Sequence, residues 1–243
     1  MHHEGREPDL WRSHSDAVNA AFVRRAIGGR RFRRALKTDL FDEATTGGVV
    51  PVMSEAAASV AGVDIAPEVA EGAAARFSGL ETLVADVRRL PFADGEFDLI
   101  VSLSTLDHLE SAEQIAGAIG ELVRVLAPGG TLALTIDNGA NPVVALRNAL
   151  PAAPLRRAGA VAYEVGPTVG PRRLARLVHE AGARPRSREA LMHCPRLPAV
   201  ALARRVPPSS SARFLRGARR FESLARLPTR YATGYFAAVV AER

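Results

Sequence analysis

Short apolar runs alternate with segments of helical periodicity along the first 140 residues. Four runs suit buried strands: "SVAGVDI" (59–65), "GLETLVADV" (79–87), "FDLIVSLS" (97–104) and "TLALTI" (131–136). One helical segment between them opens at Pro67, and another has Ser111 as its N-cap and Pro128-Gly129-Gly130 as its stop. Strands that alternate with helices predict an α/β fold, doubly wound around a mostly parallel sheet.

Further elements flank this core. Apolar residues that include Trp11, Val18, Phe22 and Ile27 share one helical face and predict an N-terminal helix. A later helix is expected at "GPRRLARLVHEAGA", a strand near "REALMH" and a final strand in "YATGYFAAVVAER". A length of 243 residues with 47% hydrophobic content fits one large domain.

Composition excludes several classes of protein. No uninterrupted apolar run approaches the roughly 18 residues that span a bilayer, and "MHHEGREPDLW" lacks the apolar centre of a secretory signal. We therefore expect a cytoplasmic protein. The single cysteine, Cys194, excludes a disulfide framework, a four-thiolate zinc site and a cysteine-held iron–sulfur cluster. No metal is expected.

Polar residues follow the ends of successive predicted strands. In chain order they are Glu43 with Gly47 and Gly48, then Asp64, Asp86, residues 104–108, and Asp137 with Asn138. Ligands of doubly wound sheets bind beyond the carboxyl ends of the strands. Carboxylates accept hydrogen bonds from ribose hydroxyls and exocyclic amines, so four acids favour a polyhydroxylated, amine-bearing ligand over a bare polyphosphate.

The stretch "ADVRRLPFADGEFDLIVSLSTLDHL", followed by "ELVRVLAPGGTLALT", carries a more specific signal. With it, residues 35 to 137 resemble the class I S-adenosylmethionine-dependent methyltransferases in order and spacing. The resemblance implies a Rossmann-like sheet of seven strands that ends in an antiparallel strand, here "YATGYFAAVVAE", with S-adenosylmethionine as cofactor. It also implies one domain over residues 1–243, made of an N-terminal helical cover (1–34), a cofactor-binding core (35–137) and a substrate-side half (138–243).

By the same resemblance, Asp64 takes the ribose hydroxyls, with Ile65 beside it in the cofactor site. Asp86 accepts from the adenine amine, and the Val87 amide lies near the ring. The loop from Glu43 to Gly48 lies under the methionine portion, and Ser104 is a candidate to line the pocket.

The glycine loop departs from the family pattern. That pattern runs acidic-x-Gly-x-Gly-x-Gly, and anchoring it on Glu43 places Thr45, Gly47 and Val49 at the three glycine positions. Because Thr45 and Val49 carry Cβ atoms, they disfavour positive φ and hold a ligand further from the backbone. The loop is either functional, with Gly48 shifting the bend by one residue, or degenerate.

Two charges also stand inside the first predicted strand. Lys37 and Asp39 occupy a segment that the fold requires to be largely apolar. If these side chains are buried, each needs a partner.

A sulfonium carries an activated methyl group, so the protein must align a nucleophile, exclude water and often remove one proton. We therefore predict methyl transfer to a small-molecule or lipid-like acceptor, which can be anionic. His108 is the candidate base, and the alternative is that Asp107 and His108 are structural or solvated.

Two other functions stay open. A non-methylating or regulatory protein could keep the cofactor site on the same fold. A dinucleotide-dependent oxidoreductase requires the three-glycine fingerprint that is missing here.

Positive charge concentrates in the C-terminal part, where residues 151–243 contain 18 arginines against five glutamates. A helical insertion is expected at about 195–229, within a stretch whose only acid is Glu222. After "PPSSS", an apolar stripe that includes Phe214 and Ala218 has arginines largely around it. This helix could be a lid packed on the sheet edge. It could instead dock an anionic or lipid-like acceptor or an anionic membrane surface. Nucleic acid is disfavoured because the aromatic residues lie on the apolar stripe.

Overall fold

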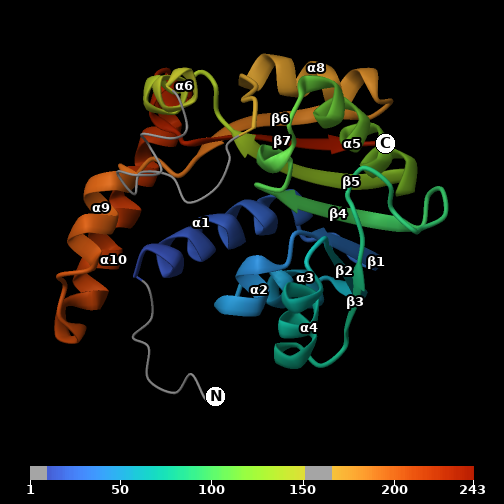
Figure 1. The fold of residues 1–243 in the computed structure, drawn as a ribbon, viewed down its shortest axis with the longest axis horizontal. Helices are drawn as coiled ribbons and strands as arrows, with labels where there is room; N and C mark the ends of the chain where they lie inside the picture. Colours follow the sequence, from blue (N-terminus) through green and yellow to red (C-terminus); the bar gives the residue numbers. More distant parts are fainter. Residues whose placement is uncertain (1–9, 151–165) are drawn as a thin grey trace.

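The computed structural model describes residues 10–150 and 166–243. Seven strands form one sheet in the order β3-β2-β1-β4-β5-β7-β6 (Figure 1). Their bounds are β1 Phe32–Thr38, β2 Ala57–Asp64, β3 Leu80–Val84, β4 Phe97–Leu103, β5 Leu126–Asp137, β6 Arg184–Leu191 and β7 Phe236–Glu242. Only β7 runs antiparallel to its neighbours, β5 and β6. The doubly wound, seven-stranded sheet with an antiparallel last strand is confirmed.

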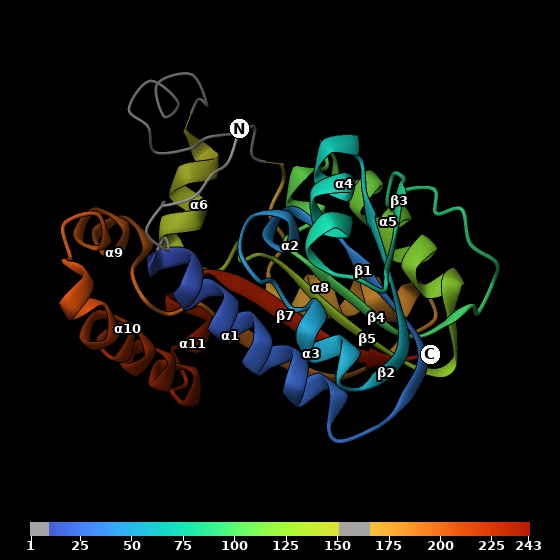
Figure 2. The same cartoon turned by 90° about the horizontal axis from the view of Figure 1, so that it is seen from below.

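Helices cover both faces of this sheet (Figure 2). Helices α1 (Leu10–Ile27), α3 (Val50–Ser54) and α4 (Pro67–Arg76) supply apolar side chains to one core cluster. Helices α5 (Ala112–Val125) and α8 (Pro171–Glu180) supply the cluster on the opposite face. The predicted N-cap is confirmed, because the Ser111 side chain accepts from the Gln114 amide at the start of α5. Buried strand runs and amphipathic helices thus account for both core layers.

The segment after β1 differs from the sequence-based prediction. The strand ends at Thr38, and the turn that follows is Asp39–Leu40, in which Asp39 has a φ of +61°. Helix α2 (Phe41–Thr45) comes next, so Gly47 and Gly48 lie between α2 and α3. The predicted loop from Glu43 to Gly48 is therefore shorter than expected, because residues 43–45 belong to α2 and the loop that contains Gly47 and Gly48 begins at Thr46. The physical reason is that the Asp39 carboxylate accepts from the Phe41 amide and starts a helix six residues before Gly47.

The insertion before β7 contains more than the expected helix. Helix α9 (Arg196–Ala203) precedes α10 (Ser211–Arg220), and a 3₁₀ turn (Phe221–Arg226) and α11 (Arg230–Thr233) follow. Both α9 and α10 pack against α1. Their contact includes Trp11, Cys194, Ala199, Phe214 and Ala218. The lid interpretation is therefore corrected in part. The stripe of α10 packs on α1, whereas the 3₁₀ turn that continues the stripe contacts β6, the edge strand of the sheet.

Helix α6 (Pro142–Ala149) follows β5. Among residues 10–150 and 166–243, no helix is long and apolar enough to cross a bilayer. Residues 1–9 of the expected N-terminal cover lie outside the described residues.

Candidate functional site

Two adjoining cavities lie beyond the carboxyl ends of the parallel strands. The smaller has a volume of about 280 Å³ and the larger about 590 Å³. They share four lining residues, Asp39, Asp64, Ile65 and His108. Both volumes are of the order found for small-molecule sites, roughly 300 to 1,000 Å³. A ligand that occupies both cavities would therefore lie across the carboxyl ends of β1, β2 and β4, which the shared residues follow.

The structure brings most of the predicted site residues together. Asp64, Ile65 and His108 line both cavities, Asp86 and Val87 line the smaller one, and Glu43, Gly48 and Ser104 line the larger one. Gly47 lines neither. The individual roles assigned to these residues stay predictions.

The Asp64 carboxylate connects two loops at the floor of the site. One oxygen accepts from the Leu40 amide at 2.8 Å, and the other accepts from the Ala66 amide at 2.9 Å. Because each carboxylate oxygen has two lone pairs, Asp64 keeps capacity for two further donors. It can therefore order the turns after β1 and β2 and still accept from ribose hydroxyls.

The Asp86 carboxylate is held by its neighbour Arg88. The Arg88 guanidinium donates to both carboxylate oxygens at 2.6 to 3.0 Å, and the Arg88 amide donates to one of them. These hydrogen bonds lower the pKa of Asp86, so its carboxylate stays ionised. Arg88 therefore orients an acceptor in the smaller cavity but also competes for its lone pairs.

A buried ion pair lies beside the larger cavity. The Lys37 ammonium is 3.8 Å from the Glu43 carboxylate and donates to the carbonyls of Thr38 and Asp39. The other Glu43 oxygen accepts from the Val49 amide. This contact answers the question of a partner for Lys37, because both charged side chains are almost fully buried and lie together.

Gly48 is required by this arrangement. Its φ is +55°, and a Cβ there would lie 2.2 Å from the Glu43 carboxylate. The glycine is thus explained by the packing of Glu43, in addition to any contact with a ligand.

Three non-glycine residues with positive φ lie at strand ends around the larger cavity. They are Asp39 after β1, Ser104 after β4 and Met192 after β6, with φ values of 61°, 53° and 62°. Such backbone costs of the order of 1 to 3 kcal/mol per residue and concentrates at functional sites. Asp39 thus occupies, under strain, a turn that glycine would form without strain. Separately, burial raises the pKa of the Asp39 carboxyl, and the Lys37 ammonium opposes this rise.

His108 lies at the junction of the two cavities, at the end of a 3₁₀ turn (Leu106–His108). Its neighbour Asp107 points away from the cavities into the core, where it accepts from the Asp137 amide. Burial, and then the Asp137 carboxylate, raise the pKa of Asp107 well above its usual range. The structure therefore separates the two residues: His108 is exposed to a ligand, and Asp107 anchors the turn.

Several lining residues were not predicted as site residues. Helix α1 contributes Trp11 and Arg12, and the segments around β6 and β7 contribute Met192, Arg196, Tyr235 and Phe236. Tyr235 and Phe236 stand at the start of the predicted last strand, but that strand is antiparallel, so its first residues share an edge with the ends of the parallel strands. This geometric signal could have found them. Among the described residues, no group of three or more His, Cys, Asp or Glu side chains could hold a metal ion.

The sequence and the fold match known proteins. Residues 44–134 match a family model described as "Methyltransferase domain". "Probable tRNA methyltransferase 9B" of Mus musculus is 44% identical over 62 residues, which are 26% of this chain and 14% of that protein. "Demethylmenaquinone methyltransferase" of Thermus thermophilus is 41% identical over 100 residues, which are 38% of this chain and 44% of that protein. The chain thus spans about a seventh of the first relative and under half of the second.

Among solved structures, the N-methyltransferase NodS from Bradyrhizobium japonicum in complex with S-adenosyl-L-homocysteine superposes with a TM-score of 0.60. It is 15% identical, and the match covers 98% of this chain and 93% of that one. This likeness establishes the fold. The family model and structural neighbours such as NodS are class I S-adenosylmethionine-dependent methyltransferases, as the resemblance predicted.

Proposed function

We propose that this chain, whose core is a class I methyltransferase domain, transfers a methyl group from S-adenosylmethionine to a small-molecule or lipid-like acceptor. The observation that carries the proposal is the pair of adjoining cavities with Asp64 and Asp86 at the ends of β2 and β3. Isothermal titration calorimetry with S-adenosylmethionine and S-adenosylhomocysteine tests it. If neither compound binds, the proposal is wrong.

The residues present fit the cofactor. Asp64 offers free lone pairs for ribose hydroxyls, and the ionised Asp86 carboxylate can accept from an exocyclic amine. Asp39, which lines both cavities, and Asp42, which pairs with Arg12, also line the larger cavity and favour cationic groups such as an ammonium or a sulfonium. When bound, the cofactor supplies an activated methyl group.

The protein's remaining tasks are to exclude water, align the acceptor and accept its proton. Trp11 and Arg12 of α1 line the larger cavity and are the proposed shield against water. His108 stands where both cavities meet and is the proposed general base. One relative is named for demethylmenaquinone, which agrees with a lipid-like acceptor.

The alternative is a non-methylating or regulatory protein on the same fold. The observation that favours it is the turn after β1, where Asp39 has a φ of +61° and its side chain lines both cavities. Tight binding of S-adenosylhomocysteine without turnover of any acceptor would support this alternative.

Asp86→Ala is expected to weaken the binding of S-adenosylmethionine at least tenfold without lowering the melting temperature. The reason is that the loss of a charge-assisted hydrogen bond costs roughly 1.5 to 3 kcal/mol. Asp64→Asn is also expected to weaken cofactor binding. The asparagine keeps one side-chain oxygen, which can still accept from either the Leu40 or the Ala66 amide. Asp94→Ala, which removes an exposed carboxylate paired with Arg124, is the control. Parent-like affinity in both site variants would contradict this placement of the cofactor.

We also propose that the insertion makes peripheral contact with an anionic membrane and that the protein is otherwise cytoplasmic. Apart from Arg196, which lines the larger cavity, its exposed arginines are Arg204, Arg205, Arg213, Arg216, Arg219, Arg220 and Arg226. Large apolar side chains of the same segment are also exposed: Leu197, Leu202, Phe221 and Leu227. Positive charge beside projecting apolar groups suits the interface of anionic lipids better than a nucleic acid, which requires exposed stacking platforms.

Changing Arg216, Arg219 and Arg220 to Gln is expected to weaken vesicle binding about 100-fold at low salt. Each arginine near an anionic surface contributes roughly 1 kcal/mol, and this contribution falls with ionic strength. Sedimentation with phosphatidylcholine vesicles that contain phosphatidylglycerol measures the effect. The matched control changes Arg172, Arg173 and Arg176 of α8, which are also exposed, to Gln. Equal losses in both triple variants, or binding only to an RNA oligonucleotide, would contradict the membrane proposal.

A further inference from the structure

The larger cavity reaches well beyond the residues assigned to the cofactor. Asp64 and Asp86 belong to the β2 and β3 side of the sheet, whereas Met192, Tyr235 and Phe236 belong to the β6 and β7 side. Four strand spacings separate β2 from β7, which corresponds to roughly 19 Å. The far end of this cavity is therefore available to a second ligand.

This far end combines apolar walls with a cation. Its apolar lining residues are Trp11, Met192, Val200 and Phe236, and the Tyr235 ring packs edge-to-face on Phe236 with centroids 5.2 Å apart. The cation is Arg196, the first residue of α9, whose guanidinium lies 5.7 Å from the centroid of the Tyr235 ring. An aromatic face holds a guanidinium in place while its N–H groups stay available for hydrogen bonds.

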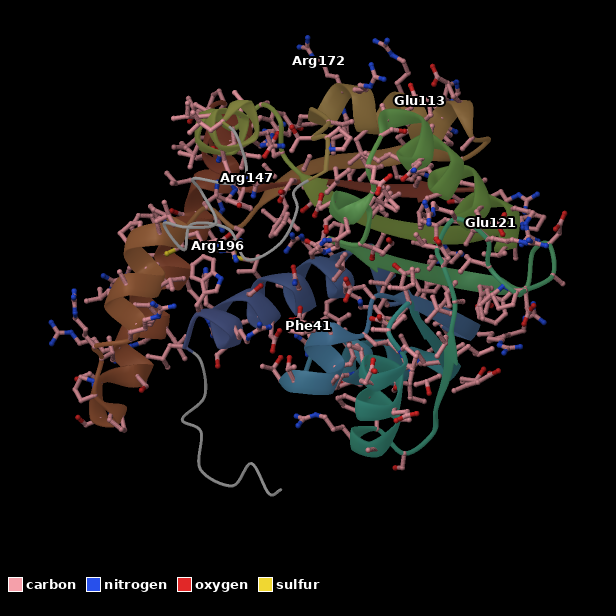
Figure 3. The ribbon with its side chains drawn as sticks, in the orientation of Figure 1. Phe41, Glu113, Glu121, Arg147, Arg172 and Arg196 are labelled. Atoms are coloured by element: carbon pink, nitrogen blue, oxygen red, sulfur yellow. The ribbon has the colours of Figure 1, made fainter. Side chains whose placement is uncertain are left out.

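A second arginine contacts the same ring. Arg147 of α6 lies 5.6 Å from the centroid of the Tyr235 ring and donates to the Tyr235 hydroxyl (Figure 3). Arg147 also forms an ion pair with the buried Asp137 carboxylate, so its charge is balanced within the protein. Tyr235 is thus held rigidly as a platform for Arg196.

Asparagine side chains hold the same platform. The side-chain amides of Asn138 and Asn141 both donate to the Gly234 carbonyl, directly before Tyr235, and the Asn141 side-chain oxygen accepts from the Val143 and Val144 amides at the N-terminus of α6. These two residues therefore support the loop that carries Tyr235 and the helix that carries Arg147.

Arg196 differs from the other cations that line the larger cavity. Arg12 lies 3.1 Å from the Asp42 carboxylate, and Lys37 lies 3.8 Å from the Glu43 carboxylate. Among the described residues, no carboxylate lies within ion-pair distance of Arg196. It lines a cavity whose acidic residues are Asp39, Asp42, Glu43 and Asp64, of which Asp42 pairs with Arg12 and Glu43 with Lys37. The Arg196 charge also opposes the rise that burial causes in the pKa of Asp137.

We propose that Arg196 binds the anionic group of the methyl acceptor, a carboxylate or a phosphate monoester, while Met192, Val200 and Phe236 contact an apolar body. That the ligand is the methyl acceptor rests on the proposed function, whereas the existence of an anion site at Arg196 does not depend on it. A guanidinium can donate two parallel hydrogen bonds to either anion. An apolar body attached to the anion would then cover the apolar side chains of Met192, Val200 and Phe236. The acceptor class is therefore an amphipathic monoanion or dianion.

The chain's single tryptophan provides a direct readout, because Trp11 lines the same cavity. Titration of Trp11 fluorescence with hexyl phosphate, hexanoate and the neutral hexanol compares anions with an uncharged analogue of equal apolar length. We expect both anions to bind more tightly than hexanol. The ratio between hexyl phosphate and hexanoate then distinguishes a phosphate-bearing acceptor from a carboxylate-bearing one.

Arg196→Gln is expected to weaken the binding of the preferred anion about tenfold or more and to leave hexanol unaffected, since a charge-assisted hydrogen bond is lost. Arg196→Lys, which keeps the charge but not the planar fork, should give an intermediate loss. Arg172→Gln on α8 removes an exposed arginine that does not line the cavity and should leave binding unchanged. Equal binding of anions and hexanol, or equal effects of the Arg196 and Arg172 variants, would overturn the proposal.

The calorimetric titration with S-adenosylmethionine separates this inference from the proposed function. If the cofactor does not bind but anion binding still depends on Arg196, methyl transfer is wrong and the anion site stands. If the cofactor binds and the Arg196 variant behaves as the parent protein, only the anion site is wrong.

Discussion

Glu43→Gln is expected to lower the free energy of unfolding by about 3 to 5 kcal/mol, the range measured when one partner of a buried ion pair is removed. The Glu43 side chain is fully buried and Lys37 is 5% exposed, so the remaining ammonium would have no compensating charge. A loss of this size is a large part of the roughly 5 to 15 kcal/mol that stabilises a typical domain. Urea denaturation followed by circular dichroism measures the change.

Three further variants make this prediction specific. Lys37→Met should also destabilise the fold, but the double variant Glu43→Gln with Lys37→Met should recover most of the loss, because no unpaired charge remains. Arg25→Gln breaks an exposed pair with Glu189 and should cost at most about 1 kcal/mol. A Glu43→Gln change no larger than the Arg25→Gln change would show that the buried pair is not ionised.

This ion pair shows both what could be predicted from the sequence and what could not. Lys37 is the only lysine of the chain and stands in a strand that must be largely apolar, so the need for a buried partner was visible. The partner was not visible, because Glu43 lies six residues later, past the end of β1 and inside α2. The Glu43 carboxylate reaches the Lys37 ammonium because the chain reverses at the Asp39–Leu40 turn.

The strand ends were predictable for a different reason. A buried parallel strand must be apolar along its length and usually becomes polar where it leaves the core, so Asp64 marks the end of β2. The predicted strand 79–87 ends earlier, at Val84, because Asp86 and Arg88 form their own turn. The position of the cavities was predictable from the fold, because the carboxyl ends of parallel strands lie along the same edge of the sheet and ligands bind there.

The acceptor end of the site could not be predicted from local pattern. Its residues come from α1, α9 and the start of β7, which are far apart in the sequence. The stripe of α10 correctly indicated a packed face, but its partner is α1, which lies about 200 residues away. Amphipathicity shows that a face is covered and does not show by what.

His108→Ala is expected to slow methyl transfer about 100-fold or more while S-adenosylmethionine binds as in the parent protein. This is the scale of the contribution that a positioned general base makes. His108 is exposed at the junction of the cavities, and both Asp39 and Asp137 are near enough for a protonated imidazole to oppose the rise in their pKa. Release of S-adenosylhomocysteine measures the rate with any acceptor that turns over, and calorimetry measures cofactor affinity.

The pH dependence separates a base from a structural residue. If His108 accepts the proton, the parent rate should rise with pH as the imidazole is deprotonated, because only the neutral ring can act as a base. The His108→Ala variant should lose that dependence, and added imidazole should restore part of its rate. His179→Ala on α8, an exposed histidine that does not line either cavity, is the control. An unchanged rate and pH profile in His108→Ala would assign this residue to the structure of the turn after β4, and deprotonation of the acceptor would then fall to solvent or to one of the carboxylates that line the larger cavity.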